Sequence, residues 1–131
     1  MTESRPLRVG LIGAGMITHH HLIGWSKVPE AQVVAVCDPI RERAEERAQV
    51  FAIDDVYDSM EDLLASKAVD AVDIATPRET HAAMVRQALA RGLAVLCQKP
   101  LAPTLAEARG LVDDAEGQIR LMVHENWRFR P

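Results

Sequence analysis

Residues 7–18 read LRVGLIGAGMIT, and this stretch decides the fold. An apolar run ends at Gly13, and a second glycine follows at Gly15, a pattern typical of a buried strand that turns into a helix. Gly13 permits the tight turn, and Gly15 has no side chain, so a pyrophosphate can approach the backbone. The helix beginning near Met16 and Ile17 offers free N–H groups and the positive end of its dipole. The stretch therefore predicts a phosphate-binding turn for a dinucleotide.

The turn alone leaves other interpretations open. Thr18 occupies the third glycine position of the G-x-G-x-x-G pattern. Glycine-rich turns between a strand and a helix also occur as plain structure, and methyltransferases bind their cofactor at a similar turn. Asp38 favours the dinucleotide, because an acid at the end of the second strand accepts hydrogen bonds from the adenosine ribose hydroxyls.

Asp38 also bears on which dinucleotide is bound. A carboxylate at this position repels a 2′-phosphate, so it favours NAD over NADP. Arg41 lies close by in the sequence and can reach a 2′-phosphate, so NADP is not excluded as the cofactor. A structural alternative is that Asp38 caps the next helix, with Pro39 as the first helical residue.

Working outward from the turn, apolar strand-like segments alternate with helix-like segments along the whole chain. We expect strands at residues 7–13, 32–38, 56–57, 69–76, 93–98 and 118–125, with a helix in each interval. Ser59 and Thr104 are the expected N-caps of two of these helices. The last helix is expected to bury one apolar face, formed by Leu105, Ala108, Val112 and Ala115.

This alternation predicts an α/β fold. Crossover helices cover both faces of such apolar strands, so the expected sheet is parallel and doubly wound. We expect a Rossmann-type sheet with strand order 3-2-1-4-5-6 in a three-layer αβα arrangement. All 131 residues are assigned to this single domain.

Composition excludes several other classes of protein. Hydrophobic residues make up 48% of the chain, charged residues 26%, and the net charge is −4, as in a globular protein without a basic tract for nucleic acid. No apolar run approaches the roughly 18 residues of a membrane span, and no signal-peptide core is present, so we expect a cytoplasmic protein.

Two cysteines, Cys37 and Cys97, suggest neither a disulfide framework nor a zinc site. The consecutive histidines 19–21 cannot converge on one metal ion from a helix.

Three further segments follow the expected fourth, fifth and sixth strands. They are residues 75–81 (ATPRETH), 97–102 (CQKPLA) and 126–131 (NWRFRP). Because the carboxyl ends of parallel strands meet at one edge of the sheet, where ligands bind, we expect these segments to border a single site.

Three of these motifs together resemble the Gfo/Idh/MocA family, relatives of glucose–fructose oxidoreductase and inositol dehydrogenase. They are the GAGMI turn, the T-P-x-x-x-H stretch at residues 76–81 and the K-P-L-A stretch at residues 99–102. The resemblance covers residues 7–131 and corresponds to the family's N-terminal NAD(P)-binding domain. It implies hydride transfer between nicotinamide and a hydroxyl-bearing carbon of a sugar, polyol or related compound. It also implies a C-terminal domain, outside these residues, for substrate binding and homo-oligomer formation.

The same resemblance implies roles for individual residues. Lys99 is the expected catalytic residue, contacting the substrate hydroxyl and assisting proton transfer. The family usually has glutamate before this lysine, whereas Gln98 keeps the hydrogen-bonding capacity towards the nicotinamide ribose without the charge. Thr76 and Pro77 are expected to line the cofactor cleft, and Arg128 to lie near cofactor and substrate, or else to form an interdomain salt bridge.

Several alternatives stay open beside this interpretation. Lys99 can be a solvated loop residue, and the Lys99–Pro100 bond is a candidate cis peptide. His81 is expected to anchor a helix start by hydrogen bonding, His21 to pack, and His124 to be a satisfied strand residue. The chain as a whole is expected to bind NAD without turnover, and a stand-alone, non-catalytic NAD-binding module or sensor is the alternative function.

Overall fold

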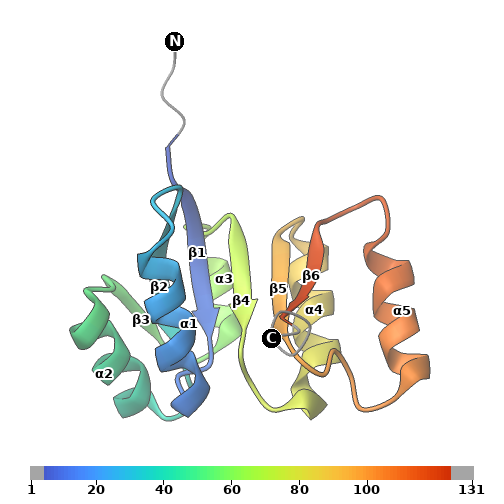
Figure 1. Cartoon of the computed structure of the whole chain (residues 1–131), viewed down its shortest axis with the longest axis horizontal. Helices are drawn as coiled ribbons and strands as arrows, with labels where there is room; N and C mark the ends of the chain where they lie inside the picture. The colour runs from blue at the N-terminus through green and yellow to red at the C-terminus, as the bar shows by residue number, and fades with distance from the viewer. Residues whose placement is uncertain (1–4, 125–131) are drawn as a thin grey trace, which may run out of the picture.

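Six strands form one parallel sheet in a computed structural model, which describes residues 5–124 (Figure 1). The strand order is β3-β2-β1-β4-β5-β6, and every neighbouring pair is parallel. The strands are β1 (Leu7–Ile12), β2 (Ala31–Cys37), β3 (Asp55–Tyr57), β4 (Ala71–Ile74), β5 (Ala94–Gln98) and β6 (Leu121–His124). The predicted doubly wound Rossmann topology is confirmed.

Helices cover both faces of this sheet. They are α1 (Met16–Ser26), α2 (Arg41–Phe51), α3 (Met60–Ala65), α4 (His81–Ala90) and α5 (Leu105–Ala115), with a 3₁₀ turn, η1 (Arg78–Thr80), before α4. Figure 1 shows α1 and α2 on one face, and α3 and α4 on the other. Two apolar clusters match these layers: Leu22 and Ala44 pack on one side, Leu63, Val85 and Leu111 on the other. The expected three-layer arrangement is therefore present.

Two helix starts follow the N-cap signals of the sequence, and the start of α2 does not. The Ser59 hydroxyl accepts a hydrogen bond from the Asp62 N–H (3.1 Å), and the Thr104 hydroxyl accepts one from the Glu107 N–H (3.2 Å), as N-caps do. The exception is α2, which begins at Arg41 after Ile40. The idea that Asp38 caps this helix, with Pro39 as its first residue, is therefore wrong.

The buried face of α5 also differs from the expected one. Leu105 and Val112 are 70% and 51% exposed, whereas Leu111 is completely buried and Ala115 nearly so. Ala108, Leu111 and Ala115 form a second regular stripe at helical spacing, and the helix turns this stripe inward. The packing of α5 beside α4 determines which of the two stripes is buried. The sequence of α5 alone does not contain this contact.

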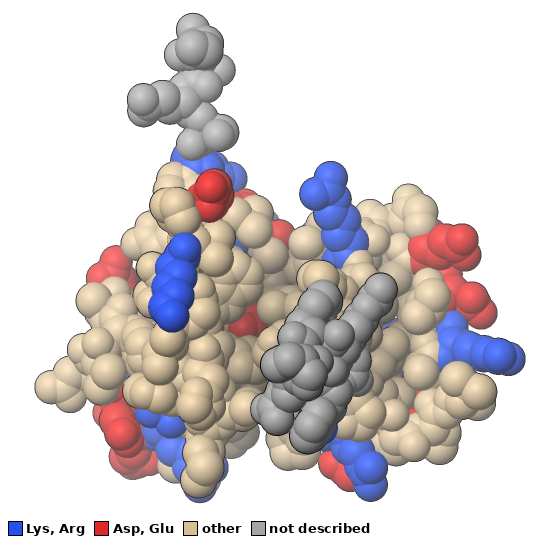
Figure 2. All heavy atoms as spheres, in the orientation of Figure 1, with Lys and Arg blue, Asp and Glu red and all other residues tan. Residues whose placement is uncertain are grey.

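The surface carries charges of both signs. Figure 2 shows acidic and basic side chains interspersed around the rim of one face, with no broad basic area. Among residues 5–124, no helix combines the length and the apolar character needed to cross a membrane.

Candidate cofactor and active site

The turn after β1 depends on Gly13. Its φ is +103°, and a Cβ placed there would lie 2.7 Å from the Ala75 carbonyl oxygen. The Gly13 N–H donates to the Cys37 carbonyl oxygen (2.9 Å), which ties the turn to the end of β2. Only glycine fits at this position, because both the backbone angle and the close approach of the loop after β4 exclude a side chain.

The second glycine of the turn faces open space. Gly15 is the N-cap of α1, and no atom of the described residues lies within 4 Å of where its Cβ would be. No side chain caps this helix, and no acidic residue occupies its first turn, where Met16 is 87% and Ile17 40% exposed. The helix thus presents backbone N–H groups and a positive dipole end to an uncovered space, which fits the pyrophosphate of a dinucleotide.

Asp38 lies against this turn at the carboxyl end of β2. Its side chain is buried, and its Oδ2 accepts a hydrogen bond from the Ala14 N–H at 2.9 Å. Its Oδ1 accepts one from the Ile40 N–H at 2.8 Å. Each carboxylate oxygen has a second acceptor position, so both oxygens can still receive a ribose hydroxyl.

Arg41, the residue considered for binding the 2′-phosphate of NADP, forms ion pairs with acidic side chains. Its guanidinium pairs with Glu45 at 2.8 Å and with Asp58 at 3.0 Å. The Asp58 and Glu45 hydrogen bonds raise the pKa of Arg41 above its ordinary value. Glu45 lies four residues after Arg41 on α2, a spacing at which opposite charges can pair.

Arg47 supports the glycine turn from α2, and it was missed from the sequence. Its Nη2 donates to the Gly15 carbonyl oxygen at 3.2 Å, and its Nε donates to the Thr18 hydroxyl at 3.3 Å. Thr18 is completely buried and donates in turn to the Gly15 carbonyl oxygen at 2.6 Å. The threonine in the third glycine position is therefore fully satisfied, and a cation lies beside the turn.

The loops after β4 and β5 are joined by His81. This side chain is completely buried, with Nδ1 at 2.8 Å from the Pro100 carbonyl oxygen and Nε2 at 2.9 Å from the Thr76 carbonyl oxygen. Thr76 also shares a 2.6 Å hydrogen bond with the Thr80 hydroxyl, while Pro77 is exposed. His81 is the first residue of α4, so its contacts match the anchoring role expected from the sequence.

Gln98 and Lys99 stand at the end of β5, on the same edge of the sheet as the glycine turn. The Lys99–Pro100 bond is cis, as the sequence suggested. Lys99 is half-buried, and within residues 5–124 its ammonium has no hydrogen bond or ion pair. Gln98 receives a hydrogen bond from His124, described below. Arg128 lies outside the described residues.

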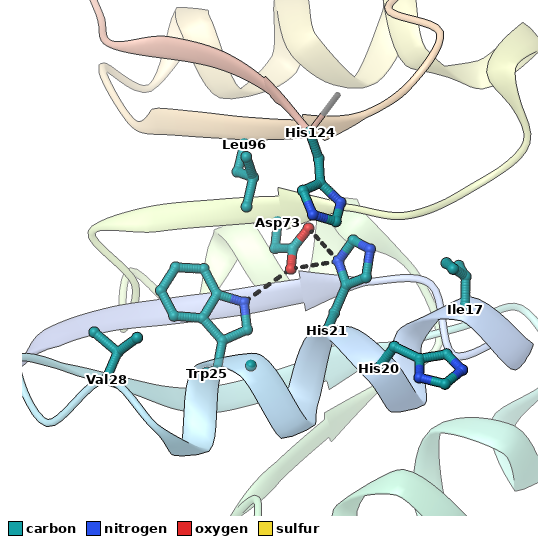
Figure 3. A pocket seen from close by; sticks show the side chains of 9 residues that line it. Ile17, His20, His21, Trp25, Val28, Asp73, Leu96 and His124 are labelled. Carbon is teal, nitrogen blue, oxygen red and sulfur yellow. Dashed lines mark hydrogen bonds and ion pairs between the residues drawn. The ribbon is translucent and has the colours of Figure 1, made fainter. Parts of the chain in front are cut away.

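A buried polar cluster lies on the face of β4 that α1 covers. Asp73 is completely inaccessible, and its carboxylate accepts hydrogen bonds from His21 Nδ1 and Trp25 Nε1, both at 2.8 Å (Figure 3). These residues border a cavity of about 580 Å³ that also touches Leu96 and His124. The packing role expected for His21 is present. The cluster itself was missed, although an acid inside the apolar run of β4 was a signal for it.

The fold and these sites define a dinucleotide-binding α/β domain of an oxidoreductase. The family described as "Oxidoreductase family, NAD-binding Rossmann fold" matches residues 7–125. The chain belongs to this family, Gfo/Idh/MocA. The resemblance drawn from the glycine turn and the two loop motifs is confirmed.

Individual relatives agree with this assignment. The chain is 39% identical to D-apiose dehydrogenase of Paraburkholderia graminis over 131 residues, covering 99% of this chain and 35% of that protein. It is 36% identical to inositol 2-dehydrogenase 4 of Saccharopolyspora erythraea, covering 98% and 39%. An Agrobacterium radiobacter oxidoreductase, solved with NAD⁺, L-tartaric acid and magnesium, superposes with a TM-score of 0.91 at 36% identity, covering 95% and 36%. The chain thus spans little more than a third of the length of these relatives.

Proposed function

We propose that residues 1–131 form the cofactor-binding part of a dehydrogenase that acts on a hydroxyl-bearing carbon of a sugar, polyol or related compound. The observation that carries this proposal is the pairing of an open glycine turn with Lys99 at one edge of the sheet. The printed names of relatives, which include D-apiose and inositol dehydrogenases, support this class of substrate. The class of reaction is hydride transfer to or from nicotinamide.

The described residues divide the cofactor between them. Gly13 and Gly15, with the N–H groups of Met16 and Ile17, would hold the pyrophosphate. Asp38 would accept hydrogen bonds from the adenosine ribose, and its buried negative charge would favour NAD over NADP. This end of the site therefore sets both the position and the identity of the dinucleotide.

The nicotinamide end of the site is formed by the loops after β4 and β5. Thr76 and Pro77 would border the nicotinamide, and Gln98 would form a hydrogen bond with the nicotinamide ribose. Arg128 is assigned to the same end by its place in the sequence. These loops are held in register by His81, which contacts both of them.

Lys99 is the proposed catalytic residue. When bound, NAD supplies the ring carbon that accepts or returns the hydride. The Lys99 ammonium polarises the reacting oxygen of the substrate and holds a proton for it. Because the residue before Lys99 is Gln98 and not glutamate, no neighbouring carboxylate in the sequence neutralises the Lys99 ammonium. Lys99 therefore acts on the substrate with its positive charge unpaired by the preceding residue.

The test is to compare NAD⁺ with ADP, which lacks both the nicotinamide and its ribose, by amide chemical shifts of the labelled chain. Both ligands should shift the Gly15 and Asp38 signals. Only NAD⁺ should shift Gln98 and Lys99, because only it reaches the end of β5. Unchanged Gln98 and Lys99 signals with saturating NAD⁺ would refute the assignment of the nicotinamide end.

A further inference from the structure

Gln98 and His124 face each other at the end of the β5–β6 ladder. They are Cα partners in the parallel register, so their side chains emerge on the same face of the sheet. His124 Nδ1 lies 3.0 Å from Gln98 Oε1. Because an amide oxygen can only accept, the proton of this hydrogen bond belongs to Nδ1, and His124 is the donor.

This hydrogen bond decides which end of the Gln98 amide is available. With Oε1 turned towards His124, the NH₂ group is left to face another partner. The side chain then offers hydrogen-bond donors, whereas an ionised glutamate at this position could only accept. A glutamine without His124 could present either end, since the amide can rotate freely.

The His124 ring is itself held in place from α1 and β4. It meets the His21 ring edge to face, with centroids 4.8 Å apart and planes at 80°. His21 is fixed by Asp73, and their side chains are 3% and 0% exposed (Figure 3). His21 Nε2 is buried and has no hydrogen-bond partner among residues 5–124, so His21 supports His124 through ring packing.

We propose that His124 is a positioning residue that turns the Gln98 amide so that its NH₂ group donates to the nicotinamide half of the cofactor. This inference rests on the proposed function, because it takes Gln98 to contact the nicotinamide ribose. His21 and Asp73 supply the rigid support for the His124 ring. The sequence gives no local signal for this pairing, since the two residues are far apart along the chain.

The experiment is a double-mutant cycle on NAD⁺ affinity, measured by calorimetry with the whole chain. His124→Phe keeps a ring against His21 and removes the donor, and Gln98→Met removes the amide at similar length. His124→Phe should weaken NAD⁺ binding roughly 2- to 10-fold, the effect of one hydrogen bond. In the Gln98→Met background, His124→Phe should cause no further loss of NAD⁺ affinity. His20→Phe makes the same substitution at an exposed position of α1 and should bind NAD⁺ like the wild type.

ADP separates positioning from general damage to the fold. Its affinity should be the same for wild type and His124→Phe, because ADP lacks both the nicotinamide and the ribose that carries it. His124→Asn keeps an N–H donor and should recover part of the lost NAD⁺ affinity. Equal losses of NAD⁺ affinity in both Gln98 backgrounds, or an equal loss of ADP affinity, would overturn the proposal.

The NMR spectrum of the ligand-free protein tests the His124–Gln98 hydrogen bond independently of NAD⁺ binding. The side-chain NH₂ resonances of Gln98 should be distinct and sharp in the wild type and should shift or broaden in His124→Phe. Unchanged Gln98 resonances would overturn the inference even if NAD⁺ binds. Failure of the wild type to bind NAD⁺, with the resonances changing as expected, would instead overturn the proposed function.

Discussion

At the residue scale, Gly13 and Gly15 contribute to the turn in different ways. Gly13→Ala places a methyl group 2.7 Å from the Ala75 carbonyl oxygen at a φ of +103°. We expect this variant to lose about 2 kcal/mol or more of unfolding free energy, in the range of strained backbone positions. Urea unfolding checks the prediction, and unchanged stability would contradict it.

Gly15→Ala is the matched substitution with the opposite expected result. Its φ of −76° suits any residue, and its Cβ would meet no atom within 4 Å in the part of the chain that the structure describes. The folded state should keep nearly its full stability, but the methyl group enters the space assigned to the pyrophosphate. Calorimetry should show clearly weaker NAD⁺ binding, and wild-type affinity would argue against this placement.

Both cysteines are expected to be inert in the folded protein. Cys37 and Cys97 are free and buried, and burial, as the main cause, raises the pKa of each thiol to about 12. The reactive form is the thiolate, so labelling with a thiol reagent at pH 8 should be very slow until the chain is unfolded in urea. Rapid labelling of the folded protein at either cysteine would contradict the structure.

At the scale of elements, Asp70 ties the start of β1 to the start of β4. It accepts hydrogen bonds from Arg5 (2.7 Å), the Arg8 side chain (3.1 Å) and the Arg8 N–H (2.9 Å). The Arg5 hydrogen bond, followed by that of Arg8, holds the pKa of Asp70 well below its ordinary value. The folded carboxylate therefore binds a proton less readily than the unfolded one.

This shift gives a stability prediction with a definite sign. The stabilisation by Asp70 is complete above the unfolded pKa of about 3.9 and is lost as pH falls further, through the lower folded pKa. Asp70→Asn should cost about 1 kcal/mol at pH 7, because exposed ion pairs are weak. The difference in unfolding free energy between Asp70→Asn and the wild type should become smaller below pH 4. Urea unfolding at pH 7 and pH 3 measures this difference. An equal difference at both pH values would contradict the lowered pKa of Asp70.

The elements themselves could be predicted from local sequence. Apolar runs located the six strands, and Ser59 and Thr104 marked two helix starts, because both signals depend on neighbouring residues. The buried stripe of α5 could not be chosen in this way. Leu111 is buried rather than Leu105 because of how α5 meets α4, a contact that the helix sequence does not contain.

The site shows the same division. The glycine turn, Asp38 and the Lys99–Pro100 stretch form compact motifs, so they can be proposed as site residues from the sequence alone. Arg47 lies among several charged residues of α2, and only the fold brings it to the Gly15 carbonyl oxygen. The contact between His124 and Gln98 likewise needs the pairing of β5 with β6.

At the scale of the whole molecule, the two halves of the sheet contribute different ends of the proposed cofactor site. The glycine turn and Asp38 belong to the half formed by β1 and β2, whereas Gln98 and Lys99 belong to the half formed by β4 to β6. Their strands all end at one edge, as in other doubly wound sheets. The fold thus brings the proposed site residues, which are distant in sequence, to one edge of the sheet, where an extended cofactor would meet them all.

This chain spans 35% to 39% of the length of the relatives compared above. We therefore propose that catalysis needs further protein surface and that residues 1–131 bind NAD⁺ without oxidising polyols or sugars. The measurement is the absorbance of NADH at 340 nm with a panel of both, at saturating NAD⁺. Steady turnover that disappears in Lys99→Met would contradict the need for further surface while supporting the role of Lys99.

The central claim is that the open glycine turn and Asp38 together bind NAD. Calorimetry of the wild-type chain with NAD⁺ and with NADP⁺ tests it most directly. We predict saturable binding of NAD⁺ that is tighter than that of NADP⁺, because the buried Asp38 carboxylate repels a 2′-phosphate. No binding of either dinucleotide would contradict the claim, and tighter binding of NADP⁺ would contradict the role given to Asp38.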